Sequence, residues 1–185
     1  MKKLIVMTLV VAACSTTVFA QSANNLYGEV AYSMVNAKDT STTDNLGTFK
    51  TSVARFTLGS VVANNVAVEG FIAQGLASDS KVINGLNVEL KNKTAYGIAI
   101  RPFFQATQDI EVFGRLGTMR SESESTVSAG NFSQSNSGKK TNMLYGVGAA
   151  YKINKDMSAT LDYTKLSKKD DLDTSLLSVG IRFNF

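Results

Sequence analysis

Apolar residues recur at every second position along most of the chain, and this spacing predicts β-strands rather than helices. Each segment with this pattern is about ten residues long, which is the length that a tilted strand needs to cross a bilayer. The pattern predicts an all-β, antiparallel fold. The eight predicted strands are Leu26–Val35, Thr51–Val62, Val66–Leu76, Asn92–Pro102, Ile110–Arg120, Thr141–Lys152, Met157–Leu166 and Thr174–Phe185.

The connections between these segments alternate between short and long. The short ones are Ala63–Asn65, Phe103–Asp109 and Ile153–Asp156, and the long ones, rich in Ser, Asn, Thr and Asp, are Asn36–Lys50, Ala77–Lys91 and Ser121–Lys140. Transmembrane barrels have short periplasmic turns and long extracellular loops, and an even strand number leaves both ends of the chain on the periplasmic side. We therefore expect an eight-stranded, up-and-down transmembrane β-barrel with this arrangement of turns and loops.

The two faces of the predicted strands differ in residue size and charge. One face carries the bulky aliphatic and tyrosine residues, and the other carries small residues, which suit the crowded interior of a narrow barrel. An arginine that faced lipid at the bilayer midplane would cost about 2–4 kcal/mol, so we expect the charges of the second face to point inward. The predicted lumenal charge network consists of Glu29, Arg55, Glu69, Arg101, Glu111, Arg115, Asp162 and Arg182.

Within this network, counting outward from the Phe103–Asp109 turn places Arg101 directly opposite Glu111. Phe71 and Phe113 share the inward face and should help to plug the lumen. The alternative is a soluble barrel whose charges solvate an outer wall. Small residues would be poor strand formers on such a wall.

The first 20 residues are typical of a cleaved signal peptide. Lys2 and Lys3 form the positive region, residues 4–13 form the apolar region, and residues 18–20 form a small-residue cleavage site before Gln21. We expect residues 21–185 to be the barrel domain. In the alternative interpretation, residues 11–14 are a lipobox and Cys14 is lipidated. The apolar region is too short for a transmembrane anchor.

Composition excludes several classes of function. Histidine is absent from the sequence, which excludes a Ser-His-Asp triad, a histidine general base and a histidine metal site. The single cysteine, Cys14, lies in the leader, so the mature chain has no disulfide. Without Lys2 and Lys3 of the leader, the net charge of +4 falls to about +2, and this balance argues against nucleic acid as a partner, whose binding proteins carry a clustered basic face. We predict no catalytic, cofactor-binding or metal-binding residues, and no enzymatic activity.

Three short motifs have competing interpretations. Residues 146–150 contain Gly146 and Gly148 but lack the third glycine and the helix of a dinucleotide-binding fingerprint. The carboxylates of Ser121–Ser125 can be a solvated loop or a site for a divalent cation, and the spacing favours the loop. A lysine cluster near the last predicted loop can bind lipopolysaccharide phosphates, although neighbouring aspartates neutralise much of its charge. The cluster is Lys165, Lys168 and Lys169.

The last segment ends in alternating apolar residues and a terminal phenylalanine. It resembles the C-terminal strand that periplasmic chaperones and the barrel-assembly machinery recognise in outer-membrane barrels. The residues that would form this assembly signal are Val179, Ile181, Phe183 and Phe185. The mature chain as a whole resembles the small, porin-like outer-membrane barrels of the OmpX, OmpA transmembrane-domain and opacity-protein type.

This resemblance implies a protein exported through the periplasm to the bacterial outer membrane. The implied partners are outer-membrane lipid and lipopolysaccharide, the assembly factors, and a host or surface ligand at the loops. OmpA-like proteins carry a peptidoglycan-binding domain after the barrel, and because this sequence ends at Phe185 we expect no such role.

The function expected from this pattern is that of a non-catalytic surface protein. The barrel would anchor exposed loops for envelope integrity, adhesion or host interaction, since loops on a rigid scaffold commonly carry function. The alternative is a narrow porin-like channel for ions or small solutes. An enzyme acting on lipid A or peptides is disfavoured because barrels with such activities use a histidine.

Overall fold

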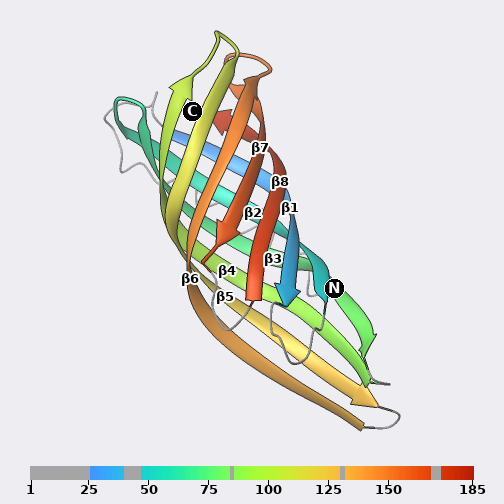
Figure 1. Ribbon diagram of the computed structural model, residues 1–185. Coiled ribbons are helices and arrows are strands. Elements are labelled where there is room, and N and C mark those ends of the chain that lie inside the picture. Colours follow the sequence, from blue (N-terminus) through green and yellow to red (C-terminus); the bar gives the residue numbers. More distant parts are fainter. Residues whose placement is uncertain (1–25, 40–46, 84–85, 130–131, 168–171) are drawn as a thin grey trace, which may run out of the picture.

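The computed structural model describes residues 26–39, 47–83, 86–129, 132–167 and 172–185. These residues form a closed barrel of eight strands, each hydrogen-bonded antiparallel to the next, with the last paired to the first (Figure 1). The strands are β1 (Leu26–Asp39), β2 (Thr48–Ala63), β3 (Val66–Ile83), β4 (Leu86–Gln105), β5 (Ile110–Ala129), β6 (Phe132–Lys152), β7 (Met157–Leu166) and β8 (Leu172–Asn184). The predicted eight-stranded up-and-down barrel is confirmed.

The predicted signal peptide, residues 1–20 with Cys14, lies outside the described residues, so both interpretations of the leader stay predictions. In the part of the chain that is described, no helix is long and apolar enough to cross a membrane.

The barrel has two unlike ends, which we name the turn end and the hairpin end. At the turn end, short connections join β2 to β3, β4 to β5 and β6 to β7, and Asn65 adopts the left-handed φ of 62° that asparagine tolerates in tight turns. The Thr107 side chain accepts a hydrogen bond from the Ile110 amide at 3.0 Å, which closes the β4–β5 turn. The start of β1 and the end of the chain meet at this same end, where the Phe185 amide donates to the Leu26 carbonyl at 3.0 Å.

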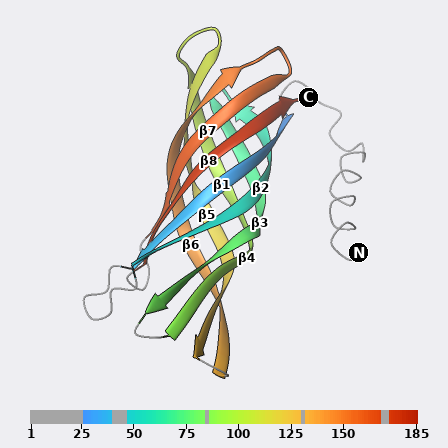
Figure 2. The same ribbon diagram turned by 90° about the vertical axis from the view of Figure 1, so that its right-hand side faces the viewer.

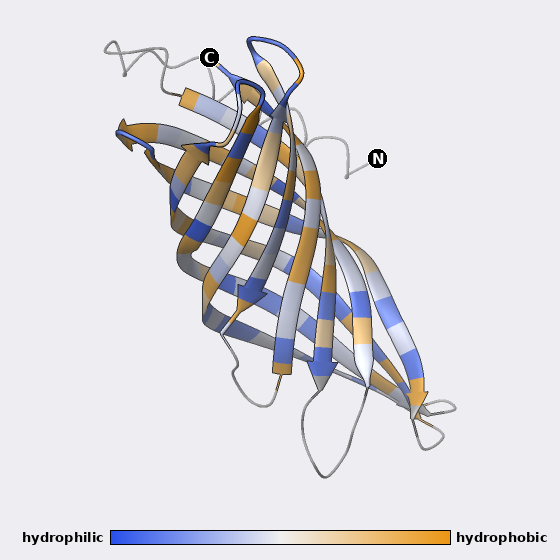
Figure 3. Cartoon of the chain, turned by 45° about the horizontal axis from the view of Figure 1, so that its top comes forward, coloured by the Kyte–Doolittle hydropathy of each residue, from blue (hydrophilic) through white to orange (hydrophobic). Residues whose placement is uncertain are grey.

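The outer wall is a band of exposed apolar side chains. Leu58, Ile98 and Val147 are each more than 60% exposed, which would be unfavourable in water and is suited to lipid. Figure 3 shows the resulting alternation of hydrophobic and hydrophilic residues along the strands. Outward aromatic residues border the band, as in other membrane barrels. They are Tyr32, Tyr96, Tyr145 and Tyr163 toward the hairpin end, and Phe104, Tyr151, Phe183 and Phe185 at the turn end.

The strands extend far beyond this band at the hairpin end. Residues 77–91 and 121–140, predicted as loops, are almost entirely paired strand, and the β5–β6 register continues to Ala129 opposite Phe132. The prediction of long loops over these residues is therefore wrong. Outside lipid both faces of a strand meet water, so the apolar alternation disappears while the backbone pairing continues. Figure 2 shows the β5–β6 hairpin projecting furthest from the barrel.

The projecting parts of these strands form a four-stranded extension of the barrel sheet. We name it the projecting sheet and define it as residues 78–83 of β3, 86–92 of β4, 121–129 of β5 and 132–142 of β6. Its β6 edge is open among the described residues, because the pairing between β6 and β7 begins only at Leu144. Its β3 edge separates from β2 beyond the pair of Ser52 with Ala77. There the Lys50 amide donates to the Asp79 carboxylate at 2.7 Å.

The apolar band generates a stability prediction. Val179 is 57% exposed on the band, so Val179→Arg should lower the free energy of unfolding by about 2–4 kcal/mol, because the guanidinium would be transferred into lipid. Ser137→Arg, at an exposed position of the projecting sheet opposite Glu124, should leave stability nearly unchanged. Equilibrium unfolding in guanidinium chloride with lipid vesicles measures both. Equal effects of the two substitutions would contradict a lipid-facing Val179.

Candidate functional site in the barrel lumen

All eight charged residues of the predicted network project into the lumen. Seven are almost completely buried, and the side chain of Glu111, nearest the turn end, is 13% exposed. They come from every strand except β6, whose inward positions include Gly146 and Gly148. The set comprises four carboxylates and four guanidinium groups, so its formal charges cancel.

Four of these side chains form a closed ring of ion pairs. Arg55 Nη2 lies 2.9 Å from Glu29 Oε1 and 2.5 Å from Asp162 Oδ1. Arg115 Nη1 lies 3.0 Å from the same Asp162 oxygen, and Arg115 Nη2 lies 3.8 Å from Glu29 Oε1. Thr164 also donates a hydrogen bond to Asp162, at 3.2 Å. The ring ties together β1, β2, β5 and β7 across the lumen.

A second series of pairs continues from this ring toward the turn end. Arg115 Nε lies 2.6 Å from Glu69 Oε2, and Arg101 Nε lies 3.5 Å from Glu69 Oε1. Arg101 Nη2 then lies 2.6 Å from Glu111 Oε1, which Arg182 Nη1 approaches at 2.8 Å. These ion pairs therefore join all eight charges into one connected cluster. Such mutual pairing is what makes buried charges tolerable.

Aromatic rings complete the surroundings of this cluster. The Tyr27 hydroxyl donates to Glu69 Oε1 at 2.8 Å. The guanidinium of Arg101 lies 3.9 Å from the centroid of the Phe113 ring, a distance at which a cation interacts favourably with a ring face. Phe71 and Phe113 are both buried in the lumen, on the inward face where the sequence pattern placed them.

The contact predicted between Arg101 and Glu111 is present, but the predicted register is wrong. Glu111 pairs in the sheet with Gln105, and Phe103 pairs with Phe113. Strand β4 continues to Gln105, so the turn lies later in the chain than the predicted Phe103–Asp109. Arg101 and Glu111 are therefore not directly opposite each other in the sheet. They meet because the long Arg101 side chain extends along the lumen toward the turn end.

Glycines opposite the lumenal aromatic residues make space for their rings. Tyr27 pairs with Gly59, and Phe113 pairs with Gly148. A β-carbon at Gly59 would collide with the Tyr27 ring, and one at Gly148 with the Phe113 ring. The sequence pattern predicted small residues in a crowded lumen. At Gly59 and Gly148 the rings of Tyr27 and Phe113 are the specific neighbours that require them.

An apolar layer separates the ion-pair cluster from the hairpin end. It contains inward-facing residues that the sequence analysis did not single out, although the same alternation places them inside. They are Val35, Val53, Met119, Leu144, Leu166 and Leu176. A void of about 30 Å³ lies between this layer and the side chains of Arg55 and Arg115. The lumen is thus filled first by charged and then by apolar side chains.

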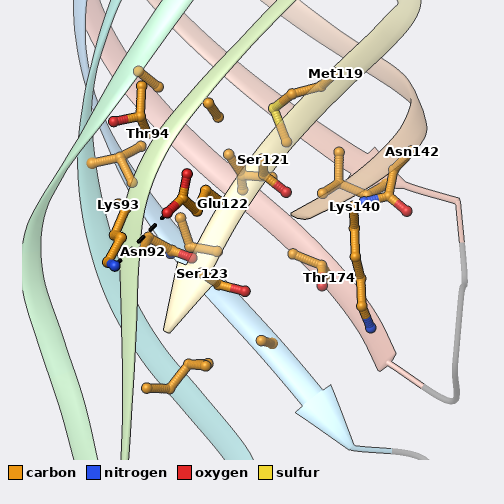
Figure 4. Close-up of a pocket in the computed structure, with 18 of the residues that line it drawn as sticks. Asn92, Lys93, Thr94, Met119, Ser121, Glu122, Ser123, Lys140, Asn142 and Thr174 are labelled. Carbon is orange, nitrogen blue, oxygen red and sulfur yellow. Dashed lines mark ion pairs between the residues drawn. The ribbon is translucent and has the colours of Figure 1, made fainter. Parts of the chain in front are cut away.

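Above the apolar layer lies a larger cavity of about 110 Å³, at the mouth of the barrel (Figure 4). Val53, Met119, Leu166 and Leu176 line both this mouth cavity and the smaller void, so they form the partition between the two. The cavity is surrounded at the hairpin end by polar side chains of β4, β5, β6 and β8. It is another feature that the sequence analysis missed, because only the folded register brings these strands together.

The acidic run at Ser121–Ser125 lies on strand β5 and is compensated by lysines, so the expected loop is wrong here. Lys93 Nζ lies 2.9 Å from Glu124 Oε2 and 3.7 Å from Glu122 Oε1, and Lys139 lies 3.6 Å from Glu122. The hydrogen bond from Lys93 holds the pKa of the Glu124 carboxyl below its usual range. The described ranges hold no group of three or more residues placed to bind a metal ion.

The lysine cluster near the last loop is only partly described. Lys165 forms an ion pair with Asp173 at 3.3 Å. Lys168 and Lys169 lie outside the described residues. The pairing between lysine and aspartate agrees with the expected neutralisation.

The lumenal cluster generates a second prediction. Glu69→Gln removes the charge that faces Arg115 and Arg101, so both cations lose a partner in a buried site. Loss of one member of a buried ion pair typically costs about 3–5 kcal/mol, and we expect a decrease of that size in the free energy of unfolding. The matched Glu124→Gln, in the partly exposed pair with Lys93, should barely move the midpoint of a urea titration. A Glu69→Gln barrel as stable as the parent would show that the cluster is not needed for stability.

Comparison with solved structures finds the same architecture in other bacterial proteins. Ail, the attachment invasion locus protein of Yersinia pestis, aligns with a TM-score of 0.62 and 19% identity over 88% of this chain and 99% of Ail. Neisserial surface protein A aligns with a TM-score of 0.61 and 15% identity over 89% of this chain and 98% of that one. A major outer membrane protein of Thermus thermophilus aligns with a TM-score of 0.56 and 10% identity, over 84% and 99% of the two chains.

Sequence comparisons add the family. No curated protein matches the sequence. Residues 6–185 match the family described as outer membrane protein beta-barrel domain, which covers the whole barrel. Together with the closed ring of eight strands and the lipid-facing apolar band, this match shows that the chain belongs to the outer membrane β-barrel protein family and has its place in the outer membrane.

Proposed function

We propose that this protein is a non-catalytic surface protein whose barrel anchors the projecting sheet for adhesion, host interaction or envelope integrity. The observation that supports this is the extension of β3 to β6 beyond the apolar band (Figures 1 and 2). A barrel that served only as an anchor would need no such extension. With the turn end in the periplasm, as short turns and chain ends indicate, the projecting sheet faces the outside of the cell.

The open β6 edge of the projecting sheet is suited to binding another protein. Residues 132–139 of β6 are all exposed, and beyond the pairing with β7 the outer edge of this strand presents backbone N–H and C=O groups. Such an edge can accept an extended segment of another protein by strand addition, in which backbone hydrogen bonds supply affinity. Its composition of Ser, Asn, Gln and Lys keeps the surface soluble and suits polar contacts.

The alternative function as a narrow channel has less support. Eight strands leave an interior that side chains can fill, and here the ion-pair cluster and the apolar layer occupy it in succession. An ion would have to separate buried charge pairs and then cross Met119 and Leu144. In planar-bilayer recordings we expect no stable conductance steps, and regular steps from purified protein would favour the channel.

The names of the structural neighbours describe those proteins alone. Ail is an attachment invasion locus protein, and its structure is also known in complex with a heparin analogue, sucrose octasulfate. At 19% identity this likeness concerns the fold, so the proposal for the present protein rests on its own projecting sheet.

The partners in biogenesis are also part of the proposal. In the completed barrel, Val179, Ile181, Phe183 and Phe185 lie along β8, which closes the ring against β1. A terminal strand of alternating apolar residues suits recognition by periplasmic chaperones and the barrel-assembly machinery before closure, after export with a cleaved leader. Outer-membrane lipid surrounds the apolar band, and Lys165 is suited to a lipopolysaccharide phosphate if that phosphate displaces Asp173.

The adhesion role predicts the effect of shortening one hairpin. Glu122 and Lys139 are cross-strand partners, so residues 123–138 can be replaced by Asn-Gly, a two-residue turn that closes such a hairpin. We expect this variant to fold, as judged by altered migration of unboiled protein in SDS gels. Bacteria that display it should lose most of their adherence to host-cell monolayers or matrix-coated surfaces, relative to the full-length protein at equal surface amounts.

A matched control keeps the sheet and changes the barrel wall. Ala149→Leu adds an apolar side chain to the exposed, lipid-facing side of β6 and should leave adherence unchanged. If the shortened variant adheres as well as the parent, the projecting sheet does not carry the interaction and the proposed function fails.

A further inference from the structure

We propose that the mouth cavity is a binding site for an uncharged amphiphile, with a short alkyl group of about four to six carbons inside the cavity and a hydrogen-bonding head at its rim. This inference is independent of the adhesion role, because it concerns the interior of the barrel mouth and not the projecting edge. It follows from the size of the cavity, the chemistry of its wall and the charges at its rim.

The size of the cavity limits the buried part of the ligand. Its volume is about 110 Å³, somewhat less than the roughly 150 Å³ of an engineered apolar cavity that binds benzene. A butyl to hexyl group or a small ring is therefore the largest apolar body that fits. The partition of Val53, Met119, Leu166 and Leu176 closes the cavity below, so the ligand enters and leaves only through the hairpin end.

The wall of the cavity favours an alkyl group over a polar one. Above the partition, the apolar side chains of Val35, Ala37, Leu90 and Leu172 line the cavity, and they come from strands β1, β4 and β8. A water molecule in such a place needs two to four polar partners, which an apolar wall does not provide. Each methylene buried there leaves water for an apolar wall, which is favourable, so a short chain suffices for weak but specific binding.

The rim selects the head group. Hydroxyl and amide side chains of Ser121, Ser123, Asn142 and Thr174 can donate and accept hydrogen bonds at the cavity opening. Figure 4 shows Lys93 and Glu122 on one side of the opening and Lys140 and Asn142 on the other, with all four beside the cavity.

The rim charges do not favour an ionic head. Lys93 is already paired with Glu124 at 2.9 Å and with Glu122 at 3.7 Å, and Lys140 is not a free cation either. An anionic ligand would compete with two carboxylates for Lys93, and a cationic ligand would meet the lysines. An amide or hydroxyl head avoids both costs.

The methionines offer a site-specific readout. Met119 lines the cavity, whereas Met34 and Met143 are 46% and 61% exposed on the lipid-facing wall. The protein would be labelled with ¹³C-methyl methionine and embedded in lipid nanodiscs, since detergent chains would compete for the cavity. Pentanamide would be the probe, with pentanoate and pentylamine as charged counterparts of equal chain length.

We expect pentanamide to shift the Met119 methyl resonance saturably while the Met34 and Met143 resonances change only linearly, by partitioning into lipid. The two charged probes should bind at least about tenfold more weakly, a difference of about 1.4 kcal/mol. A Met119 resonance that does not saturate overturns the site, and equal binding of pentanoate or pentylamine overturns the uncharged class of ligand.

Filling the cavity supplies the mutational test. Ala95 lines the cavity and packs against the apolar layer, so Ala95→Leu should abolish the saturable shift. The matched Ala149→Leu makes the same change on the lipid-facing wall and should retain the shift. If Ala95→Leu does not fold, Leu172→Phe fills the cavity from its rim and tests the same point. Unchanged binding in a folded, filled variant overturns the proposal.

Discussion

The exclusion of charge from lipid is the constraint on which the rest of this structure depends. A strand that crosses the bilayer has one face toward the acyl chains, so every charge in the crossing segment has to turn inward. In a barrel of eight strands the interior is too narrow to keep such charges apart or to hydrate each one. They have to neutralise one another, and the connected cluster from Glu29 to Arg182 is the result.

This cluster also explains the distribution of small and aromatic residues. Strand β6 presents Gly146 and Gly148 to the lumen instead of charges, and a β-carbon at these positions would collide with Thr164 and with Phe113. The Phe113 ring occupies the space over Gly148 and lies against Arg101. Charge pairing, ring placement and glycine positions are therefore one packing solution. Because this packing fills the lumen, the parts of the protein that can bind a ligand or a partner are the mouth of the barrel and the strands beyond it.

Sequence alone predicted the parts that the bilayer dictates. Strand number and the inward direction of all eight charges follow from alternation, because lipid on one side enforces period two. The contact between Arg101 and Glu111 was predicted instead by counting outward from the turn. The register of that contact was wrong, since alternation fixes the face of a residue but not the residue opposite to it. The ends of β3 to β6 were misplaced for a related reason: beyond the lipid, water on both faces removes the periodic signal while the backbone pairing persists.

The mouth cavity lies at the boundary between the strand segments within lipid and the strand segments beyond it. This position explains why no local sequence pattern indicated the cavity. Its wall combines inward apolar residues of the crossing segments, such as Met119 and Leu176, with polar residues of the projecting strands, such as Ser123. Just below it the charges require close packing, and just above it the strands separate into the projecting sheet and lose their opposing wall. A cavity is the expected outcome at this height, because four strands continue where eight are needed to fill the middle. Above the partition, its lining residues take no part in the lumenal ion-pair cluster, so they are freer than the rest of the lumen to be selected for a ligand.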